Sequence, residues 1–448
     1  NPKTPIYKYK TMNINDYNLI LEITAIIVFI TAYIFITLEE ITEIKKSKPA
    51  LISAGIIWII TAIILTNNSK EEILILSIKK NLTEYCELFL FLFSTMIYIN
   101  SMKDRFIFKK LKSIITKIEL TSKKIYWIIG ILSFIISPIA DNLTTALIMS
   151  SILISIEKKN KQFINLCFIN IVIASNAGGS FSPFGDITTL MLWQSNILKF
   201  SLFFKIIIPS ILSFLIPSFI ISLNIKEKKI NKVKKKISIK YGGNATLFFF
   251  IVTIFISILM QNYLNIPSAI GMMTGLSFLQ ILEFISKKKK DNFSMINQIK
   301  KIEWDTLLFF YGTILSIGAI STIGCLNEIS NILYYKIGQY TNIIHQQTPA
   351  NILIGLTSSI IDNIPIMFAV ITMNPIMSEG QWLLINLTAG IGGSLLSIGS
   401  AAGIALMGQN KKKYTFFSHL KHSYSILIGY IFSIYIHIII NKKLFLII

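Results

Sequence analysis

Long apolar runs separated by lysine-rich loops constrain the fold of this chain more than any other feature. Hydrophobic residues fill 53% of its 448 positions, and the mean hydropathy is +0.64. Soluble domains hold about 45–50% apolar residues with far more charge, whereas a spanning helix needs roughly 20 apolar residues. We therefore predict an all-α polytopic membrane protein with about ten transmembrane helices. The expected spans are about 17–38, 50–67, 83–100, 163–193, 197–223, 244–262, 267–286, 304–322, 382–409 and 423–440.

The formal net charge of +21 comes from lysines that cluster between the apolar runs. Basic runs can indicate binding to nucleic acid or anionic lipid. Here each run adjoins an apolar segment, which favours the excess of Lys and Arg that cytoplasmic loops carry. We therefore expect membrane lipid as a partner and no nucleic acid.

One pattern occurs twice in the chain and interrupts an apolar stretch each time. The run GGSFSPFGD at 178–186 aligns with GGSLLSIGS at 392–400, and upstream of them SPIADNL at 137–143 aligns with SSIIDNI at 358–364. Paired interrupted segments in two halves are typical of secondary transporters built from inverted repeats. The glycines of the duplicated pattern are Gly178, Gly179, Gly185, Gly392, Gly393 and Gly399.

Loop charges predict how the two copies lie in the membrane. The loops at 101–125 and 157–162 are both lysine-rich, so 126–156 should enter and leave on the same side as a re-entrant hairpin. The connections at 341–349 and 378–381 hold no Lys or Arg, so 350–377 should be a hairpin from the opposite face.

These two hairpins predict a pair of inverted-topology repeats. The repeats are expected at 17–223 and 244–440, with broken helices at 163–193 and 382–409. The basic segment 224–243 is the expected cytoplasmic linker between them.

Three carboxylates lie at the interruptions: Asp141 and Asp362 at the hairpin tips, and Asp186 at the first helix break. A carboxylate at membrane depth costs at least ~2.5–3.5 kcal/mol and is by default a functional residue. We expect no ion-pair partner for them, because the apolar segments hold almost no basic residue apart from Lys199 and Lys205 at one edge.

The ligands available at the breaks favour a hard cation, since they are oxygens of carboxylates, amides and hydroxyls. A desolvated carboxylate holds either a proton or a cation, which is the basis of exchange. Asp186 and Ser400 occupy the same slot of the two patterns, so one half carries a titratable group where the other is neutral. The predicted cation- and proton-binding residues are Asp141, Asn142, Asn176, Asp186, Thr188, Thr189, Asp362, Asn363, Ser397 and Ser400.

The motifs SPIADNLTT (137–145), NAGGSFSPFGDITTLMLW (176–193), WDTLL (304–308), SSIIDNIPIMFAVITMN (358–374) and GGSLLSIGSAAGIALMGQ (392–409) resemble those of NhaD-type sodium/proton antiporters. That family belongs to an ion-transporter superfamily that also includes sodium-coupled dicarboxylate carriers. The resemblance implies exchange of sodium or lithium for protons in the bacterial inner membrane, without any cofactor. It also implies inverted repeats, an elevator movement and a homodimer.

The resemblance also implies roles for individual residues. It places the transported sodium or lithium at Asp141, Asn142, Asp186, Asp362 and Asn363, and it adds Glu87, Ser137, Ser358 and Asp305 as supporting residues.

Three other functions fit these motifs less well. A dicarboxylate carrier would need hairpin tips with little negative charge, whereas both tips here carry Asp before Asn. An arsenite exporter also has acidic tips, but the run GGSFSPFGDITT favours an antiporter. An intramembrane aspartyl protease needs Gly-x-Gly-Asp, and Pro183 stands where its first glycine would be.

Overall fold

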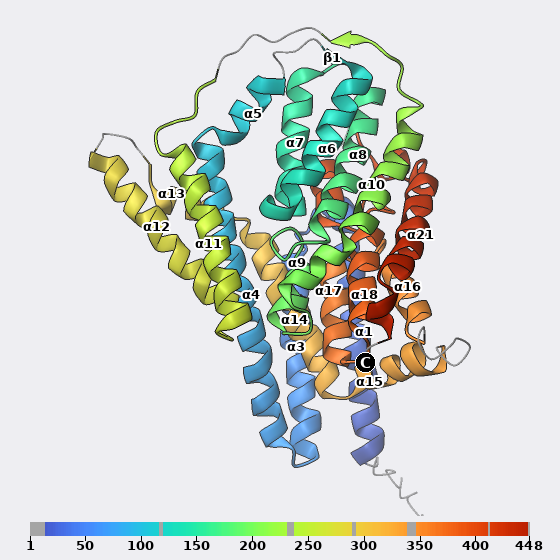
Figure 1. Ribbon diagram of the computed structural model, residues 1–448. Helices are drawn as coiled ribbons and strands as arrows, with labels where there is room; N and C mark the ends of the chain where they lie inside the picture. The colour runs from blue at the N-terminus through green and yellow to red at the C-terminus, as the bar shows by residue number, and fades with distance from the viewer. Residues whose placement is uncertain are drawn as a thin grey trace, which may run out of the picture.

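Helices make up nearly all the regular structure of this protein, seen in a computed structural model (Figure 1). The structure describes residues 14–115, 120–230, 237–288, 293–337, 346–410 and 413–446. Residues 231–236 of the predicted linker lie outside this described part. Two two-residue strands, β1 (Leu120–Thr121) and β2 (Lys229–Ile230), pair antiparallel with Leu120 opposite Ile230.

The first half of the chain contains α1 (Ile14–Thr37), α2 (Glu39–Thr42), α3 (Ser47–Asn67), α4 (Glu71–Asp104), α5 (Ile107–Ile115), α6 (Ser122–Ala140), α7 (Asn142–Ile156), α8 (Lys161–Gly179), α9 (Ile187–Gln194), η1 (Phe200–Ile206) and α10 (Ile207–Ser222). The second half contains α11 (Gly243–Tyr263), α12 (Ser268–Lys288), α13 (Met295–Ile299), α14 (Trp304–Thr322), α15 (Cys325–Ser330), η2 (Asn331–Lys336), α16 (Thr348–Thr357), α17 (Asn363–Met373), α18 (Glu379–Gly392), α19 (Ala401–Gln409), α20 (Phe416–Leu420), α21 (Ser423–Ile440) and η5 (Lys442–Phe445).

Ten helical segments in the described residues are long and apolar enough to cross a membrane, which confirms the predicted membrane class and number of spans. The set of ten segments differs from the ten expected spans at two places. Ser122–Ala140, expected as one arm of a hairpin, is itself long enough to span. The expected span 382–409 is absent from the ten because a break divides it into α18 and α19.

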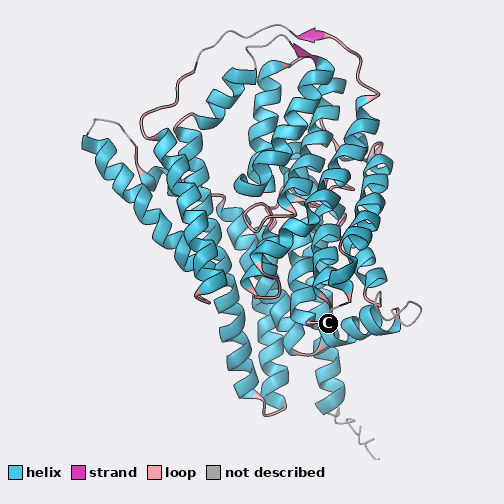
Figure 2. Ribbon diagram, in the orientation of Figure 1, coloured by secondary structure: helices cyan, strands magenta, loops and turns pink. Residues whose placement is uncertain are grey.

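Both predicted broken helices are interrupted as the glycines suggested. A non-helical segment separates α8 from α9, and another separates α18 from α19. Figure 2 shows loop segments in the middle of the helical bundle as well as at its ends. Backbone of this kind inside a membrane protein requires surrounding protein or water to satisfy its polar groups, so these breaks mark the interior that a polar solute could occupy.

Two hydrophobic clusters organise the packing. One draws on α1, α3, α4, α12, α14, α17 and α18, and within it α14 packs on both α3 and α17. The other surrounds α8 with α6, α7, α10, α19 and α21. Each cluster contains residues from before and after the linker, so helices of the two halves interleave and hold the breaks between them.

Candidate functional site

Each of the four interruptions ends with a polar side chain that caps the following helix. Asp141 Oδ1 accepts a hydrogen bond from Thr144 N at 2.7 Å, and Asp186 Oδ1 accepts one from Thr188 N at 3.3 Å. In the second half Asp362 caps α17, and Ser400 caps α19 through Gly403 N at 3.3 Å. Such caps satisfy amides at the start of a helix, where the backbone dipole favours negative charge. The sequence spacing thus places three carboxylates and one hydroxyl at helix starts.

Matched serines hold the two breaks against the helices that precede them. Ser137 Oγ donates to Ser175 O at 2.5 Å, and Ser358 Oγ donates to Ala389 O at 2.8 Å. The two acceptors stand three residues before the first glycine of their respective patterns. Both serines are fully buried, and these hydrogen bonds give them a supporting position rather than one in a cavity.

The first glycine of each pattern lies where the backbone of a neighbouring helix leaves no room for a side chain. A Cβ atom at Gly178 would lie 2.3 Å from Phe134 O, and one at Gly392 would lie 1.9 Å from Gly355 O. No side chain fits at such distances. The duplicated glycines therefore let the helix pairs α6/α8 and α16/α18 approach closely next to each break.

A carboxylate from the first half is bound by an amide from the second at the centre of the molecule. Asn363 Nδ2 lies 3.4 and 3.3 Å from the two carboxylate oxygens of Asp186. Both residues are buried, with exposures of 3% each. Asp186 has no basic partner among the ion pairs of the described residues, so its charge would be compensated only by dipoles.

The corresponding cluster around Ser400 is neutral. Asn142 Nδ2 donates to Asn176 Oδ1 at 3.2 Å, and Asn176 Nδ2 lies 3.0 Å from Ser400 Oγ and 2.9 Å from Ser394 Oγ. These side chains connect the α7 start, α8 and the second break. The structure thus brings Asn142, Asn176 and Ser400 together as an uncharged hydrogen-bonded group.

Thr188 and Thr189 lie beside an asparagine that the sequence analysis did not select. Their hydroxyls donate to Asn386 Oδ1 at 3.4 and 3.0 Å, while Asn386 Nδ2 donates to Ser180 O at 2.8 Å. Asn386 lies in α18 ahead of the duplicated pattern, so the repeat offered no signal for it.

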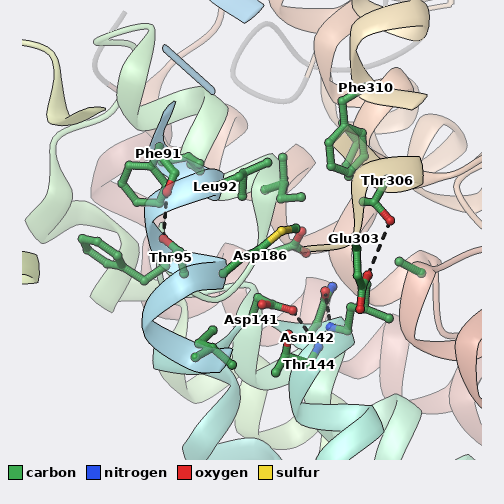
Figure 3. A pocket seen from close by; sticks show the side chains of 18 of the residues that line it. Phe91, Leu92, Thr95, Asp141, Asn142, Thr144, Asp186, Glu303, Thr306 and Phe310 are labelled. Atoms are coloured by element: carbon green, nitrogen blue, oxygen red, sulfur yellow. Dashed lines mark hydrogen bonds between the residues drawn. The ribbon is translucent and has the colours of Figure 1, made fainter. Parts of the chain in front are cut away.

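A cavity of about 90 Å³ opens next to Asp186; its wall is largely apolar but carries several charged and polar side chains, and it is called the polar cavity below. Figure 3 shows Asp141, Asp186 and Glu303, from separate elements, around the same space. This volume holds several water molecules, enough for a partly hydrated small cation. The other polar side chains on its walls are Thr95, Asn100, Lys103, Asn142, Thr144, Lys301, Thr306 and Asn363.

Asp141 has an unusual backbone conformation at the edge of this cavity. Its φ of 53° and ψ of 161° fall in a region that only glycine adopts readily, at a cost of about 1–3 kcal/mol. The amide of Asn142 donates to Gly185 O at 3.0 Å, which ties the hairpin tip to the first break. Strain of this kind at a carboxylate points to a functional constraint.

Asp362 contradicts our expectation that the carboxylates lack a cationic partner. Lys46 Nζ lies 3.7 Å from Asp362 Oδ2, with side-chain exposures of 9% and 5%. Lys46 precedes α3 and therefore lies outside the apolar core of every expected span, which is why the sequence did not reveal it. Asp362 lines a separate cavity of about 20 Å³.

The remaining predicted residues are distributed around these groups. Ser397 Oγ is buried and has no hydrogen-bond partner in the described part of the chain, but the residue lines neither of these two cavities. Glu87 does not line the polar cavity, although Phe91 on the next turn does. Asp305 Oδ1 accepts a hydrogen bond from Ser47 Oγ between α3 and α14, while its neighbour Glu303 lines the cavity instead.

Within the described residues, no group of three or more His, Cys, Asp or Glu side chains is arranged to hold a metal ion. The carboxylates are thus spread around the cavity rather than gathered into a chelating cluster.

Comparison with known proteins gives a family model and several relatives. Residues 18–390 match the family model described as citrate transporter (CitMHS). The chain is 42% identical to the Na(+)/H(+) antiporter NhaD of Halomonas elongata, over 94% of this chain and 89% of that protein. It is also 42% identical to the NhaD of Vibrio cholerae, over 94% and 92%. Sodium/proton antiporter 1 of Arabidopsis thaliana is 29% identical over 87% of this chain and 68% of its own length.

Proposed function

Since the chain belongs to the NhaD group of Na(+)/H(+) antiporters and matches the citrate-transporter family model, we propose that it exchanges sodium ions for protons across a membrane. Its relatives are transporters, and the chain is a multi-pass membrane protein by its ten apolar helices. We further propose the bacterial inner membrane as its location, lithium as a second cation, and a homodimer as its assembly.

The single observation that carries this proposal is the environment of Asp186. It is buried, contacted by Asn363 from the other half, and exposed to the polar cavity. A carboxylate without a basic partner cannot stay charged in such a place at low cost. It holds either a proton or a sodium ion, and competition between the two couples their movements in opposite directions.

The cavity also supports a direction of access. Lys103 and Lys301 on its wall adjoin loops whose charge predicts a cytoplasmic location. We propose that this conformation receives sodium from the cytoplasm. The ion displaces the proton from Asp186, with Asp141 as the second titrating group, and an elevator movement of the helices around the breaks then exposes the site outside.

Two inverted repeats remain our proposal for the architecture behind that movement. The matched bonds of Ser137 and Ser358, and the matched contacts of Gly178 and Gly392, support an equivalence between residues 17–223 and 244–440. The pairs α6/α7 and α16/α17 would be the re-entrant hairpins.

A citrate or dicarboxylate carrier is the second candidate, favoured by the family model's description and by Lys103 and Lys301 on the cavity wall. Against it stand Asp141, Asp186 and Glu303 on the same wall. Three carboxylates on the wall of a partly desolvated cavity would repel an anionic substrate.

Everted membrane vesicles separate the two candidates. Addition of sodium or lithium to vesicles with a respiration-driven proton gradient should release protons and restore the fluorescence of a gradient-sensing dye. Vesicles without the protein are the control. Uptake of radiolabelled citrate or succinate without any cation-induced proton release would overturn the antiporter proposal.

A further inference from the structure

We propose that Lys46 is a built-in counter-ion of Asp362, which occupies this carboxylate in the cation-free protein and has to be displaced when a transported cation binds there. The inference rests on the proposed sodium/proton exchange and deepens it, because it adds a residue that competes with the cargo. No motif contains Lys46, which was found only through its position in the folded chain.

The pair is buried and links the start of α3 to the start of α17, two helices that both pack on α14. Lys46 immediately precedes α3, which packs on α1 and α14, while Asp362 caps α17, which packs on α9, α14 and α18. By contrast the neighbouring Lys45 pairs with Glu39 at the surface, where the lysine side chain is 66% exposed. Among the ion pairs of the described residues, only that of Lys46 reaches a site carboxylate, while Lys103 shares a cavity wall with Asp141 without pairing with it.

The surroundings of Lys46 stabilise a positive charge. Its ammonium lies 4.3 Å from the centre of the Phe309 ring, within the range of a cation–π contact. Phe309 belongs to α14, and Tyr33 of α1 lines the adjacent cavity of about 20 Å³. A cation site is thus already built around Asp362, and a lysine side chain fills it.

The bond between the two charges is nevertheless loose. At 3.7 Å it is an ion pair rather than a close hydrogen bond, and Asp362 Oδ2 accepts no hydrogen bond from the described residues. The adjoining cavity leaves space for the ammonium to shift, and Glu39 lines that same cavity. Glu39 is a second carboxylate that could receive Lys46 once it leaves Asp362.

Electrostatics make occupation by lysine and by cargo mutually exclusive. Two positive charges on one buried carboxylate repel each other strongly at low dielectric. A sodium ion that binds Asp362 must therefore drive the Lys46 ammonium away from this carboxylate. Displacement of the lysine would remove the ion pair that links the start of α3 to the start of α17.

Chemical labelling of the full-length wild-type protein tests this directly. Purified protein in lipid vesicles is exposed to a short pulse of acetic anhydride in sodium chloride or in choline chloride at equal ionic strength, and acetylation is measured by mass spectrometry. Sodium should raise acetylation of Lys46 and leave that of Lys45 unchanged. Equal or lower labelling of Lys46 in sodium would overturn the inference.

Transport kinetics supply the second test. Lys46→Gln removes the competitor, so the sodium concentration for half-maximal exchange should fall at least about fivefold, the lower end of ordinary coupling between ligands. The maximal rate need not rise. Lys46→Arg keeps the charge and should keep the wild-type value, as should the surface control Lys45→Gln. A reduced maximal rate of Lys46→Gln at an unchanged half-maximal concentration would show a structural role and overturn the inference.

The two levels of the proposal fail in different ways. If wild-type vesicles show no sodium-driven proton release, the proposed function is wrong and the inference fails with it. If wild-type exchange is present but sodium affects neither Lys46 labelling nor the kinetics of Lys46→Gln, only the inference fails.

Discussion

Asp141 and Asp362 occupy equivalent positions in the duplicated motif and both cap the helix that follows, yet they differ in backbone strain and in charge compensation. Asp141 is partly exposed to the larger polar cavity and has a strained backbone with φ of 53°. Asp362 has an ordinary φ of −49° and is paired with Lys46. The same sequence motif therefore presents an open carboxylate in one half and a compensated one in the other.

The two helix breaks differ in the same sense. Asp186 is bound by Asn363 and adjoins the cavity, whereas Ser400 belongs to a neutral group with Asn142 and Asn176. The backbone devices around them, serine hydrogen bonds and closely approached glycines, are alike. The duplication thus accounts for the similar backbone of the two breaks, whose side chains differ in charge.

The largest effect is expected from neutralising the charged break. Asp186→Asn should abolish sodium-driven proton release in everted vesicles, because an amide can neither bind a proton nor neutralise a cation. Ser400→Ala is the matched control in the other half. It removes a cap and a hydrogen bond worth about 1 kcal/mol each and should reduce exchange without eliminating it. Normal exchange by Asp186→Asn would remove Asp186 from the mechanism.

The second effect concerns stability and separates the two hairpin acids. Asp362→Asn leaves Lys46 buried without its partner and should lower the free energy of unfolding by about 3–5 kcal/mol. Asp141 forms no ion pair in the described part of the chain, where Lys103 only shares its cavity wall, so Asp141→Asn should have a smaller effect. Thermal unfolding of the purified variants in detergent measures both, and the double variant Lys46→Gln/Asp362→Asn should regain part of the loss. Equal melting temperatures for the two single variants would contradict this difference.

The third prediction concerns a histidine that anchors only the second break. His419 Nε2 lies 2.8 Å from Ser394 O, and its Nδ1 lies 2.7 Å from the hydroxyl of Tyr414. Burial lowers the pKa of His419 from 6.5 to about 4, although the bond to Ser394 opposes the shift. The folded protein therefore keeps this imidazole neutral, and protonation favours unfolding.

The neutral His419 makes its full contribution to the free energy of unfolding above about pH 6.5. That contribution is lost as the pH falls toward 4, and the loss reaches about 2 kcal/mol at pH 5. His419→Gln retains a donor for Ser394 O and should flatten the fall in melting temperature between pH 7 and pH 5. An equally steep fall in the variant would exclude His419 as its source.

The smallest effect is expected from releasing the strain at Asp141. Glycine adopts the backbone conformation found at Asp141 without the strain of about 1–3 kcal/mol. As a helix cap, glycine is only a few tenths of a kcal/mol less favourable than aspartate. Asp141→Gly should therefore raise stability by about 1 kcal/mol while it impairs exchange. Asp362→Gly, where φ is negative, should only destabilise. Calorimetry that shows Asp141→Gly to be the less stable of the two would refute the assignment of strain.

Much of the fold could be predicted because its signals are local. Apolar length predicted most of the ten helical segments in the described residues that are long enough to cross a membrane. Glycines followed by Asp186 or Ser400 marked the two helix breaks, and Asp141 and Asp362 marked the starts of α7 and α17. The positions of the helices and their breaks depend on hydrogen bonding and burial within one or two helical turns, so they can be derived from neighbouring residues. The prediction differed where a helix was long enough to span although it had been assigned to a hairpin, as with α6.

Contacts between distant segments could not be derived in this way. Asn363 on Asp186, Asn386 beside Thr188 and Thr189, Glu303 in place of Asp305 on the cavity wall, and Lys46 on Asp362 all join residues from different helices. Which side chains meet depends on helix rotation and crossing, and these follow from the packing of the whole bundle. By itself the sequence determined the membrane class, the breaks and the three acids, because those depend on composition and local spacing. Only the tertiary structure decided which acid faces an open cavity and which already holds a lysine, because burial and charge pairing arise when separate helices come together.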